Sequence, residues 1–173
     1  MTPPFIPPSH FAAVQEGLYR GSFPDTINYP FLESLHFKCI VSMLPDGEPE
    51  GVKQFCEKNK IKHIHIDTEE YDVDCIPSKE EKNRVISLLL DSDLYPLFFF
   101  GSQSSMITSV YVMLLRFVQR YHSSFIFREF KKFDEKIDDD LKSIFDDLRI
   151  TLPAHLPRWL PVNAINPQVL LPE

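Results

Sequence analysis

Apolar and polar residues change their spacing along the chain in a way that predicts alternating strands and helices. The run Ile61–Ile66 alternates strictly between apolar and polar residues, which is typical of a strand with one buried face. Lys38–Leu44 and Leu97–Phe100 are short apolar runs that predict buried strands. Leu18–Arg20, between two turn glycines, predicts a further short strand.

Helical spacing occupies the stretches between and after these runs. Asn28 is expected to cap the first helix, and Ser78 is expected to cap another. One expected helix follows Asn28. The others lie at about Pro49–Asn59, Ser78–Leu90, Ile107–Tyr121, Phe125–Phe133 and Lys136–Leu148. In Ile107–Tyr121, Val110, Leu114 and Phe117 should be among the least accessible residues. Strands that alternate with helices predict an α/β fold, with a central, mostly parallel sheet of four to five strands flanked by helices.

The two ends of the chain differ from its middle. Residues 1–10 contain four prolines and are expected to be extended. Residues 11–149 carry the predicted strands and helices and are interpreted as one domain. Residues 150–173 contain five prolines, but also more apolar residues than a solvated linker would. We expect them to form an extended strap on the domain or on a partner, with Trp159 as an anchor.

Charge and cysteine content narrow the class of protein. A formal net charge of −7 disfavours binding to nucleic acid or to an anionic membrane. Cys39, Cys56 and Cys75 lack metal-like spacing and are expected to be free thiols, which favours a cytoplasmic protein. His63 and His65 share one face of a predicted strand and could suit a metal ion. The sequence places no third ligand there, so we expect neither a metal nor a cofactor.

The loop from Gly101 to Ile107 lies between a predicted strand and a predicted helix. Phosphate-binding enzymes place their chemistry at such loops, because backbone N–H groups converge there and the helix dipole favours an anion. This loop nevertheless contains no Cys, Lys, Arg, His or Asp. Its hydroxyls belong to Ser102, Ser104 and Ser105, and no base adjoins them in the sequence to activate one as a nucleophile. The simpler interpretation is that they satisfy backbone groups of the loop.

Two stretches resemble a known family. LYRGSFP at residues 18–24, followed by INYPFLESLHFKCIVSM at 27–43, resembles the N-terminal signature of the plant and fungal atypical dual-specificity phosphatases, which include the fungal oxidant-induced cell-cycle-arrest proteins. The strand, loop and long apolar helix at 95–117 resemble the phosphatase loop of these enzymes. The resemblance runs from about Pro8 to Leu148 and implies the fold of cysteine-dependent tyrosine and dual-specificity phosphatases.

The resemblance also implies which loop residues to compare. The family's loop reads His-Cys-x-x-Gly-x-x-Arg-Thr, in which the Cys thiolate is the nucleophile and the Arg grips the phosphate. On that pattern Gly101 stands at the Cys and Ile107 at the Arg. Phe100 stands at the His, Ser104 at the Gly, and Thr108 matches. The degenerate positions run in order through Phe100, Gly101, Ser102, Gln103, Ser104, Ser105, Met106, Ile107 and Thr108. We therefore expect no catalytic residue in the loop.

The acidic run after the strand Ile61–Ile66 is where the family carries a general-acid Asp. Asp67, Asp72 and Asp74 are candidates by position only. Without a leaving group to protonate, a solvated charged loop is the simpler interpretation. Cys75 lies near this run, where acidic neighbours disfavour a thiolate, whereas Cys39 and Cys56 are expected in the core.

Three functions remain open on this basis. The first is a pseudophosphatase that binds other proteins, with related phosphatase-like subunits as the partners that the resemblance implies, within inositol pyrophosphate signalling. The second is a weak phosphatase, acting on phosphotyrosine or an inositol pyrophosphate, with a non-standard nucleophile. The third is a sensor that binds a phosphorylated ligand through loop amides alone. Loss of the Arg weighs against the sensor, because a bidentate charged clamp is the strongest part of such sites.

Overall fold

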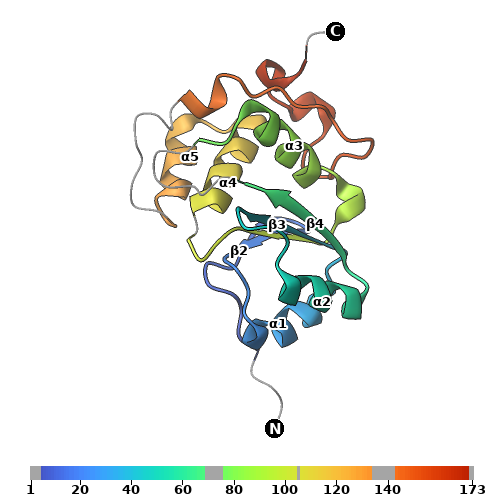
Figure 1. Cartoon of the computed structure of the whole chain (residues 1–173). Helices are drawn as coiled ribbons and strands as arrows, with labels where there is room; N and C mark the ends of the chain where they lie inside the picture. The colour runs from blue at the N-terminus through green and yellow to red at the C-terminus, as the bar shows by residue number, and fades with distance from the viewer. Residues whose placement is uncertain (1–4, 69–75, 105, 134–142, 172–173) are drawn as a thin grey trace. The chain divides into compact units, whose positions relative to one another are not determined.

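The computed structural model describes residues 5–68, 76–104, 106–133 and 143–171 (Figure 1). Its contacts divide the chain into two units. The first is Met1–Glu70 with Leu94–Thr108, and the second is Tyr71–Asp93 with Ser109–Glu173. The domain boundaries predicted from the sequence, after residues 10 and 149, stay predictions.

The first unit contains a five-stranded sheet in the order β1-β2-β5-β3-β4. The strands are β1 (Ala12–Gln15), β2 (Leu18–Gly21), β3 (Cys39–Leu44), β4 (Lys62–Asp67) and β5 (Leu97–Phe100). All neighbours are parallel except β1, which pairs antiparallel with β2. The predicted α/β fold with a mostly parallel sheet of four to five strands is confirmed.

The sequence did not predict β1, because its residues Ala-Ala-Val-Gln contain a single β-branched residue and no strict apolar–polar alternation. The turn between β1 and β2 contains Gly17, as predicted. Its φ of +79° lies in the left-handed region, and an added Cβ would come within 2.8 Å of the Tyr95 ring. Glycine alone meets both conditions without strain.

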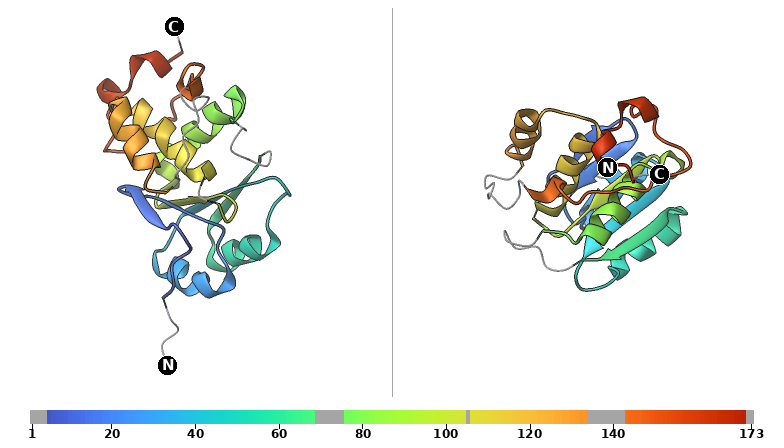
Figure 2. Two further views of the ribbon diagram at one scale, coloured as in Figure 1. Left: turned by 90° about the vertical axis from the view of Figure 1, so that its left-hand side faces the viewer. Right: turned by 90° about the horizontal axis from the view of Figure 1, so that it is seen from above.

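Two helices cover one face of this sheet, α1 (Tyr29–Ser34) and α2 (Glu50–Asn59) (Figures 1 and 2). They bury aromatic and aliphatic side chains against β3 and β5, and this core consists of Leu32, Phe37, Ile40, Leu44, Val52, Phe55, Cys56, Ile61, Phe98 and Phe100. At the end of α2, Lys60 takes a left-handed φ of 56° and stops the helix.

Asn28 does not cap α1 with its side chain as predicted. It closes a preceding 3₁₀ turn, η1 (Thr26–Asn28), where its Oδ1 accepts a hydrogen bond from the Asp25 N–H at 2.8 Å. Its Nδ2 donates to the Ile6 carbonyl at 3.1 Å and so ties the N-terminal segment to this turn. The side chain is used by the tertiary structure, which overrides its local preference for a helix cap.

The second unit is helical. It contains α3 (Lys79–Leu89), α5 (Ser123–Phe130) and all but the first three residues of α4 (Met106–Val118). A short turn, η2 (Ser92–Leu94), follows α3. Ser78 caps α3 as predicted, because its side chain accepts from the Glu81 N–H at 3.2 Å. Among the helices that the structure describes, none has the length and apolar composition that crossing a membrane requires.

Helix α4 is shorter than the predicted Ile107–Tyr121. It ends at Val118, and Arg120 takes a left-handed φ of 63°. Leu114 is fully buried and Val110 is 4% exposed, as expected. The prediction for Phe117 is wrong, because it is only half-buried. Its ring stacks on Phe145, with 4.6 Å between ring centroids.

The helix predicted at Lys136–Leu148 is not continuous to its expected end. Residues 134–142 lie outside the described chain, 143–145 form a 3₁₀ turn, and Leu148 is buried but not helical. A buried lysine of α3, Lys82, holds this segment in place. Its Nζ donates to the Ile144 carbonyl at 3.0 Å and pairs with the Asp147 carboxylate.

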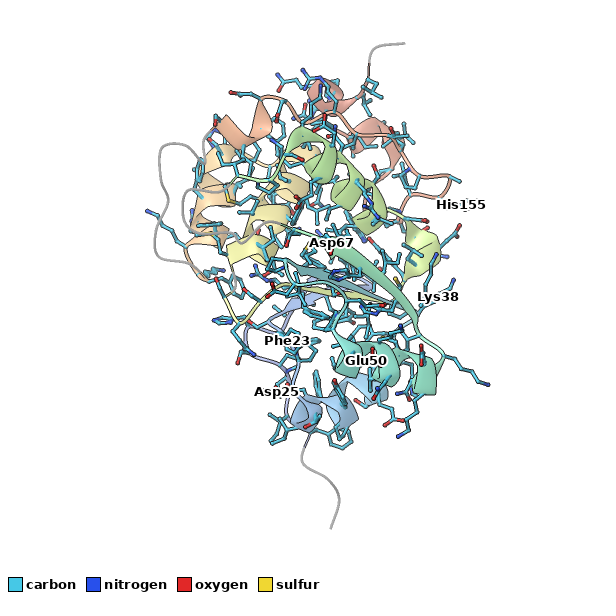
Figure 3. The ribbon with its side chains drawn as sticks, in the orientation of Figure 1. Phe23, Asp25, Lys38, Glu50, Asp67 and His155 are labelled. Atoms are coloured by element: carbon cyan, nitrogen blue, oxygen red, sulfur yellow. The ribbon has the colours of Figure 1, made fainter. Side chains whose placement is uncertain are left out.

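The C-terminal tail is extended only in part. It contains two 3₁₀ turns, η4 (Val162–Ala164) and η5 (Pro167–Val169), and Ile150 bridges to Leu170. The tail lies on the helices of its own unit, because the Asn166 N–H donates to the Val118 carbonyl at 2.8 Å at the end of α4. Figure 3 labels His155 in this tail, where a hydrogen bond to Asp93 raises the pKa of the imidazole.

Candidate functional site

The candidate site lies at the carboxyl edge of the sheet in the first unit. Strands β5, β3 and β4 are parallel, so the loops that follow them leave from the same edge. The loop after β5 exposes Ser102, Gln103 and Ser104, whereas Ser105 lies outside the described residues. The Ser102 carbonyl accepts a hydrogen bond at 3.3 Å from the N–H of Phe23, which Figure 3 labels on the segment after β2.

Gly101 and Ile107 meet at the two ends of this loop. Gly101 is buried, and Ile107 is 4% exposed. An added Cβ on Gly101 would overlap Ile107 Cγ2 and lie 3.6 Å from Ile107 Cβ. The Ile107 methyl group therefore fills the space that any side chain at position 101 would enter. Ile107 is thus a core residue.

Two other loop residues are held by hydrogen bonds. Ser104 Oγ accepts from the Met106 N–H at 3.1 Å, so this hydroxyl satisfies a backbone group at the start of α4, as the simpler interpretation expected. Thr108 Oγ1 accepts from Arg20 Nη2 at 2.7 Å. Arg20 is 2% exposed, and the sequence analysis did not single it out. The signal that could have identified it was the presence of an arginine in a short predicted strand.

Phe100 is an integral part of the aromatic core. Its ring stacks on Phe98 and meets Phe23 edge-on, with 5.6 Å between centroids in both pairs. A phenyl ring has no nitrogen with which to orient a neighbouring group. This position therefore contributes packing and can contribute no acid–base chemistry.

The acidic candidates are only partly described. Asp72 and Asp74 lie outside the described residues, as does Cys75. Asp67 is the last residue of β4, as Figure 3 shows, and its side chain is 80% exposed. Its Oδ1 lies 3.0 Å from His65 Nε2, so the structure places Asp67 beside a histidine.

The two described cysteines belong to the core, as predicted. Cys39 and Cys56 are both buried free thiols. Burial raises the pKa of Cys56 to about 12, with smaller contributions from Cys39 and from acidic residues. Cys56 is therefore a neutral thiol at physiological pH, whereas a nucleophilic cysteine needs to be a thiolate.

The histidine pair of β4 meets a hydroxyl of β3. His63 Nε2 and His65 Nδ1 each lie 2.9 Å from Ser42 Oγ, which is fully buried. His63 Nδ1 also lies 3.0 Å from Glu48 Oε1. In the part of the chain that the structure describes, no group of three or more His, Cys, Asp or Glu residues is placed to hold a metal ion. Ser42 was not predicted as a site residue, although Ser42 is the one polar residue between Cys39 and Leu44.

Comparisons with known proteins agree with this fold. The Tyrosine phosphatase family matches residues 5–150. The chain is 30% identical over 160 residues to the "Probable tyrosine-protein phosphatase DG1060" of Dictyostelium discoideum, covering 90% of this chain and 96% of the relative. It is 30% identical over 130 residues to "Inositol diphosphatase DSP4" of Arabidopsis thaliana, covering 75% of this chain and 66% of the relative. It is 32% identical over 149 residues to "Putative tyrosine-protein phosphatase OCA6" of Saccharomyces cerevisiae, covering 77% and 66%.

Solved structures show the same fold. The core catalytic domain of the PP-IP phosphatase SIW14 from S. cerevisiae, in complex with citrate, superposes with a TM-score of 0.75 at 22% identity, covering 82% of this chain and 87% of that one. The fold is therefore that of cysteine-dependent phosphatases. With the match over residues 5–150 and the plant and fungal relatives, the chain belongs to the tyrosine phosphatase family, in the branch that includes the plant and fungal atypical dual-specificity phosphatases.

Proposed function

We propose that this protein is a pseudophosphatase, which keeps the fold of its family without the catalysis and binds other proteins as a scaffold subunit. The observation that carries the proposal is the contact between Gly101 and Ile107. Gly101 stands where the resemblance places the nucleophilic Cys, and the Ile107 methyl group occupies the volume that a Cβ there would need. Neither the nucleophile nor the space for it is available.

Three further observations support the loss of catalysis. The buried Phe100 ring stands where the resemblance places a His, and Ile107 stands in place of the Arg that grips phosphate. The Ser104 hydroxyl already accepts a hydrogen bond from the Met106 N–H at the start of α4. Cys56 is held as a neutral thiol by burial. Buried free thiols at Cys39 and Cys56 also fit the cytoplasmic location that we propose.

Related phosphatase-like chains are the partners that we propose. This part of the proposal rests on the partners that the resemblance to the fungal members of the family implies. One plant relative is named an inositol diphosphatase. On that ground we propose inositol pyrophosphate signalling as the process in which this protein acts. A weak phosphatase with an unrecognised nucleophile, and a sensor of phosphorylated ligands, are the alternatives that the following assay separates.

The purified protein should show no turnover of aryl phosphates, phosphopeptides or inositol pyrophosphates above a buffer blank. The physical reason is that no group at position 101 can form the phosphoenzyme bond. Phosphate release is the measurement, with an active relative assayed in parallel. Turnover that survives repurification and is lost in Ser102→Ala, Ser104→Ala or Ser105→Ala would contradict the proposal. Binding of inositol pyrophosphate without turnover, measured by calorimetry, would favour the sensor.

The scaffold role predicts which proteins the full chain captures. Affinity purification of the tagged chain from its source cells, followed by mass spectrometry, should enrich other members of the tyrosine phosphatase family. A tagged, unrelated protein of similar size is the control bait. Enrichment of chaperones alone, or of nothing beyond the control, would overturn the scaffold role and leave the activity result unaffected.

A further inference from the structure

Five side chains form a continuous line of short contacts on the sheet face that carries α2. Glu48 Oε1 lies 3.0 Å from His63 Nδ1, and His63 Nε2 lies 2.9 Å from Ser42 Oγ. Ser42 Oγ lies 2.9 Å from His65 Nδ1, and His65 Nε2 lies 3.0 Å from Asp67 Oδ1. We call this the histidine cluster. Nothing in the proposed function uses it.

The cluster has more contacts than hydrogens. Four contacts join the five side chains, and each needs one hydrogen to be a hydrogen bond. Two neutral imidazoles supply one N–H each, the Ser42 hydroxyl supplies one, and ionised carboxylates supply none. Three hydrogens therefore serve four contacts. One contact lacks a hydrogen until the cluster takes up a proton.

The geometry identifies the contact without a hydrogen. His63 Nδ1 is buried and lies 3.0 Å from Glu48 Oε1, close enough for a hydrogen bond, but among the described residues this contact is not aligned as one. The other three contacts meet the geometry of hydrogen bonds. In the neutral cluster His63 Nε2–H donates to Ser42 Oγ, Ser42 Oγ–H donates to His65 Nδ1, and His65 Nε2–H donates to Asp67. The lone pair of His63 Nδ1 then faces the Glu48 carboxylate.

We propose that His63 Nδ1 is a proton-binding site whose occupancy controls how firmly the loop 45–49, between β3 and α2, is held to the sheet. A proton from solvent adds to the Nδ1 lone pair, and no other bond breaks. The resulting imidazolium attracts the Glu48 carboxylate, and a small shift of Glu48 that aligns Oε1 with the new N–H turns a repulsive contact into a charge-assisted hydrogen bond. Glu48 belongs to this loop. The loop therefore moves least when both oxygens of the Glu48 carboxylate have a partner.

The charges around His63 decide the pH at which this happens. Glu48 faces it from the loop, and Lys53 of α2 lies 3.5 Å from the other Glu48 oxygen. His65 and Asp67 lie on the same strand as His63, and Ser42 lies on β3. Burial is the largest influence and lowers the pKa of His63 below its usual 6.5, while Glu48 opposes this shift. His63 therefore takes up its proton at a lower pH than an ordinary histidine does.

The histidine cluster lies near the edge of the sheet that carries the candidate site. Strands β3 and β5 are parallel neighbours, with Ser42 paired to Phe100. The loop 45–49 and the loop that begins at Gly101 consequently leave the same edge of the sheet. Proton binding at His63 thus acts on the edge that carries the candidate site, whether or not that site binds a ligand.

Nuclear magnetic resonance of the imidazole nitrogens in the full chain tests the proposal. At neutral pH, His63 should be the Nε2–H tautomer with an unprotonated Nδ1. On acidification His63 should become an imidazolium with a midpoint below 6.5, and the backbone amides of Asp46, Gly47 and Glu48 should shift with the same midpoint. Glu48→Gln should lower that midpoint by about 1 pH unit, because it removes the facing charge.

Glu50→Gln is the matched control. It removes the same charge two residues away, from an exposed carboxylate that accepts from Gln54 Nε2 at 2.9 Å. Solvent screens that charge, so the His63 midpoint should move much less. An Nδ1–H tautomer or an imidazolium at neutral pH would overturn the proposal. Equal shifts in the two variants, or loop amides that do not follow His63, would overturn it as well.

Discussion

Replacing Gly101 by alanine should destabilise the protein by about 1–3 kcal/mol, the usual effect of overpacking a filled core. The added Cβ would overlap Ile107 Cγ2, so the side chain or the start of α4 has to move. The Gly101 backbone does not lie in the left-handed region, and alanine can adopt it without strain. The substitution therefore measures packing alone. The free energy of unfolding, from urea denaturation, is the measurement.

A double-mutant cycle shows whether the two residues compete for one space. Ile107→Ala alone should cost about 2–4 kcal/mol, because it leaves a cavity at a position that is 4% exposed. In the double variant Gly101→Ala with Ile107→Ala, the new methyl group enters the space that Ile107 has left. The double variant should be more stable than the sum of the single effects by about 1–3 kcal/mol.

Gly51→Ala is the control for the glycine substitution. Gly51 lies in α2, where an added Cβ would meet only the Tyr29 hydroxyl, at 3.3 Å. Alanine favours a helix interior over glycine by about 1 kcal/mol, so this variant should be neutral or slightly more stable. If Gly101→Ala behaves like Gly51→Ala, or if the cycle is additive, position 101 has room for a side chain and our account of the site is wrong.

The periodic patterns predicted the central elements of the fold well. The apolar run Leu97–Phe100 is β5 with the same bounds, and the alternating run at Ile61–Ile66 is β4, moved by one residue. Half-buried strands and amphipathic helices show a periodic pattern of apolar residues because each buries one face and exposes the other along its whole length. Local chemistry was also sufficient at Ser78, whose cap depends only on the next turn of chain.

Predictions failed where distant residues decide the structure. Phe117 has the spacing of a core residue, but it is only half-buried, and its ring stacks on Phe145. The tail contains short turns that were not predicted, and Asn166 beside them bonds to the end of α4. These contacts join residues 28 or more positions apart, and no periodicity within one segment can reveal them.

The candidate site shows the same division. The sequence of the loop predicted which chemical groups are missing. The overlap between Ile107 and position 101 depends on how α4 begins, so the sequence could not show it. The sequence placed His63 and His65 on one strand face, but it could not show that the Ser42 hydroxyl contacts both, because that depends on the pairing register of β3 with β4.

Restoring the two central groups, by Gly101→Cys with Ile107→Arg, should give a less stable protein that still has no phosphatase activity. Arginine at 107 forfeits about 1.5–3 kcal/mol of apolar burial and brings a charge into a poorly solvated position. It also stands beside Thr108, whose hydroxyl already accepts from the buried Arg20. Phe100 and Ser104 would remain in place of the family's His and Gly, so the thiol lacks the surroundings that form a thiolate and the loop lacks a glycine.

The measurement that tests the central claim most directly is the pre-steady-state burst of this double variant. An aryl phosphate is mixed with the folded protein, and phosphocysteine is counted by mass spectrometry alongside the free energy of unfolding. Our account predicts no burst and a loss of stability, because Gly101 and Ile107, at the two ends of the loop, are packed against each other in the core. Phosphocysteine approaching one per molecule, without loss of stability, would show an intact phosphate cradle and would contradict it.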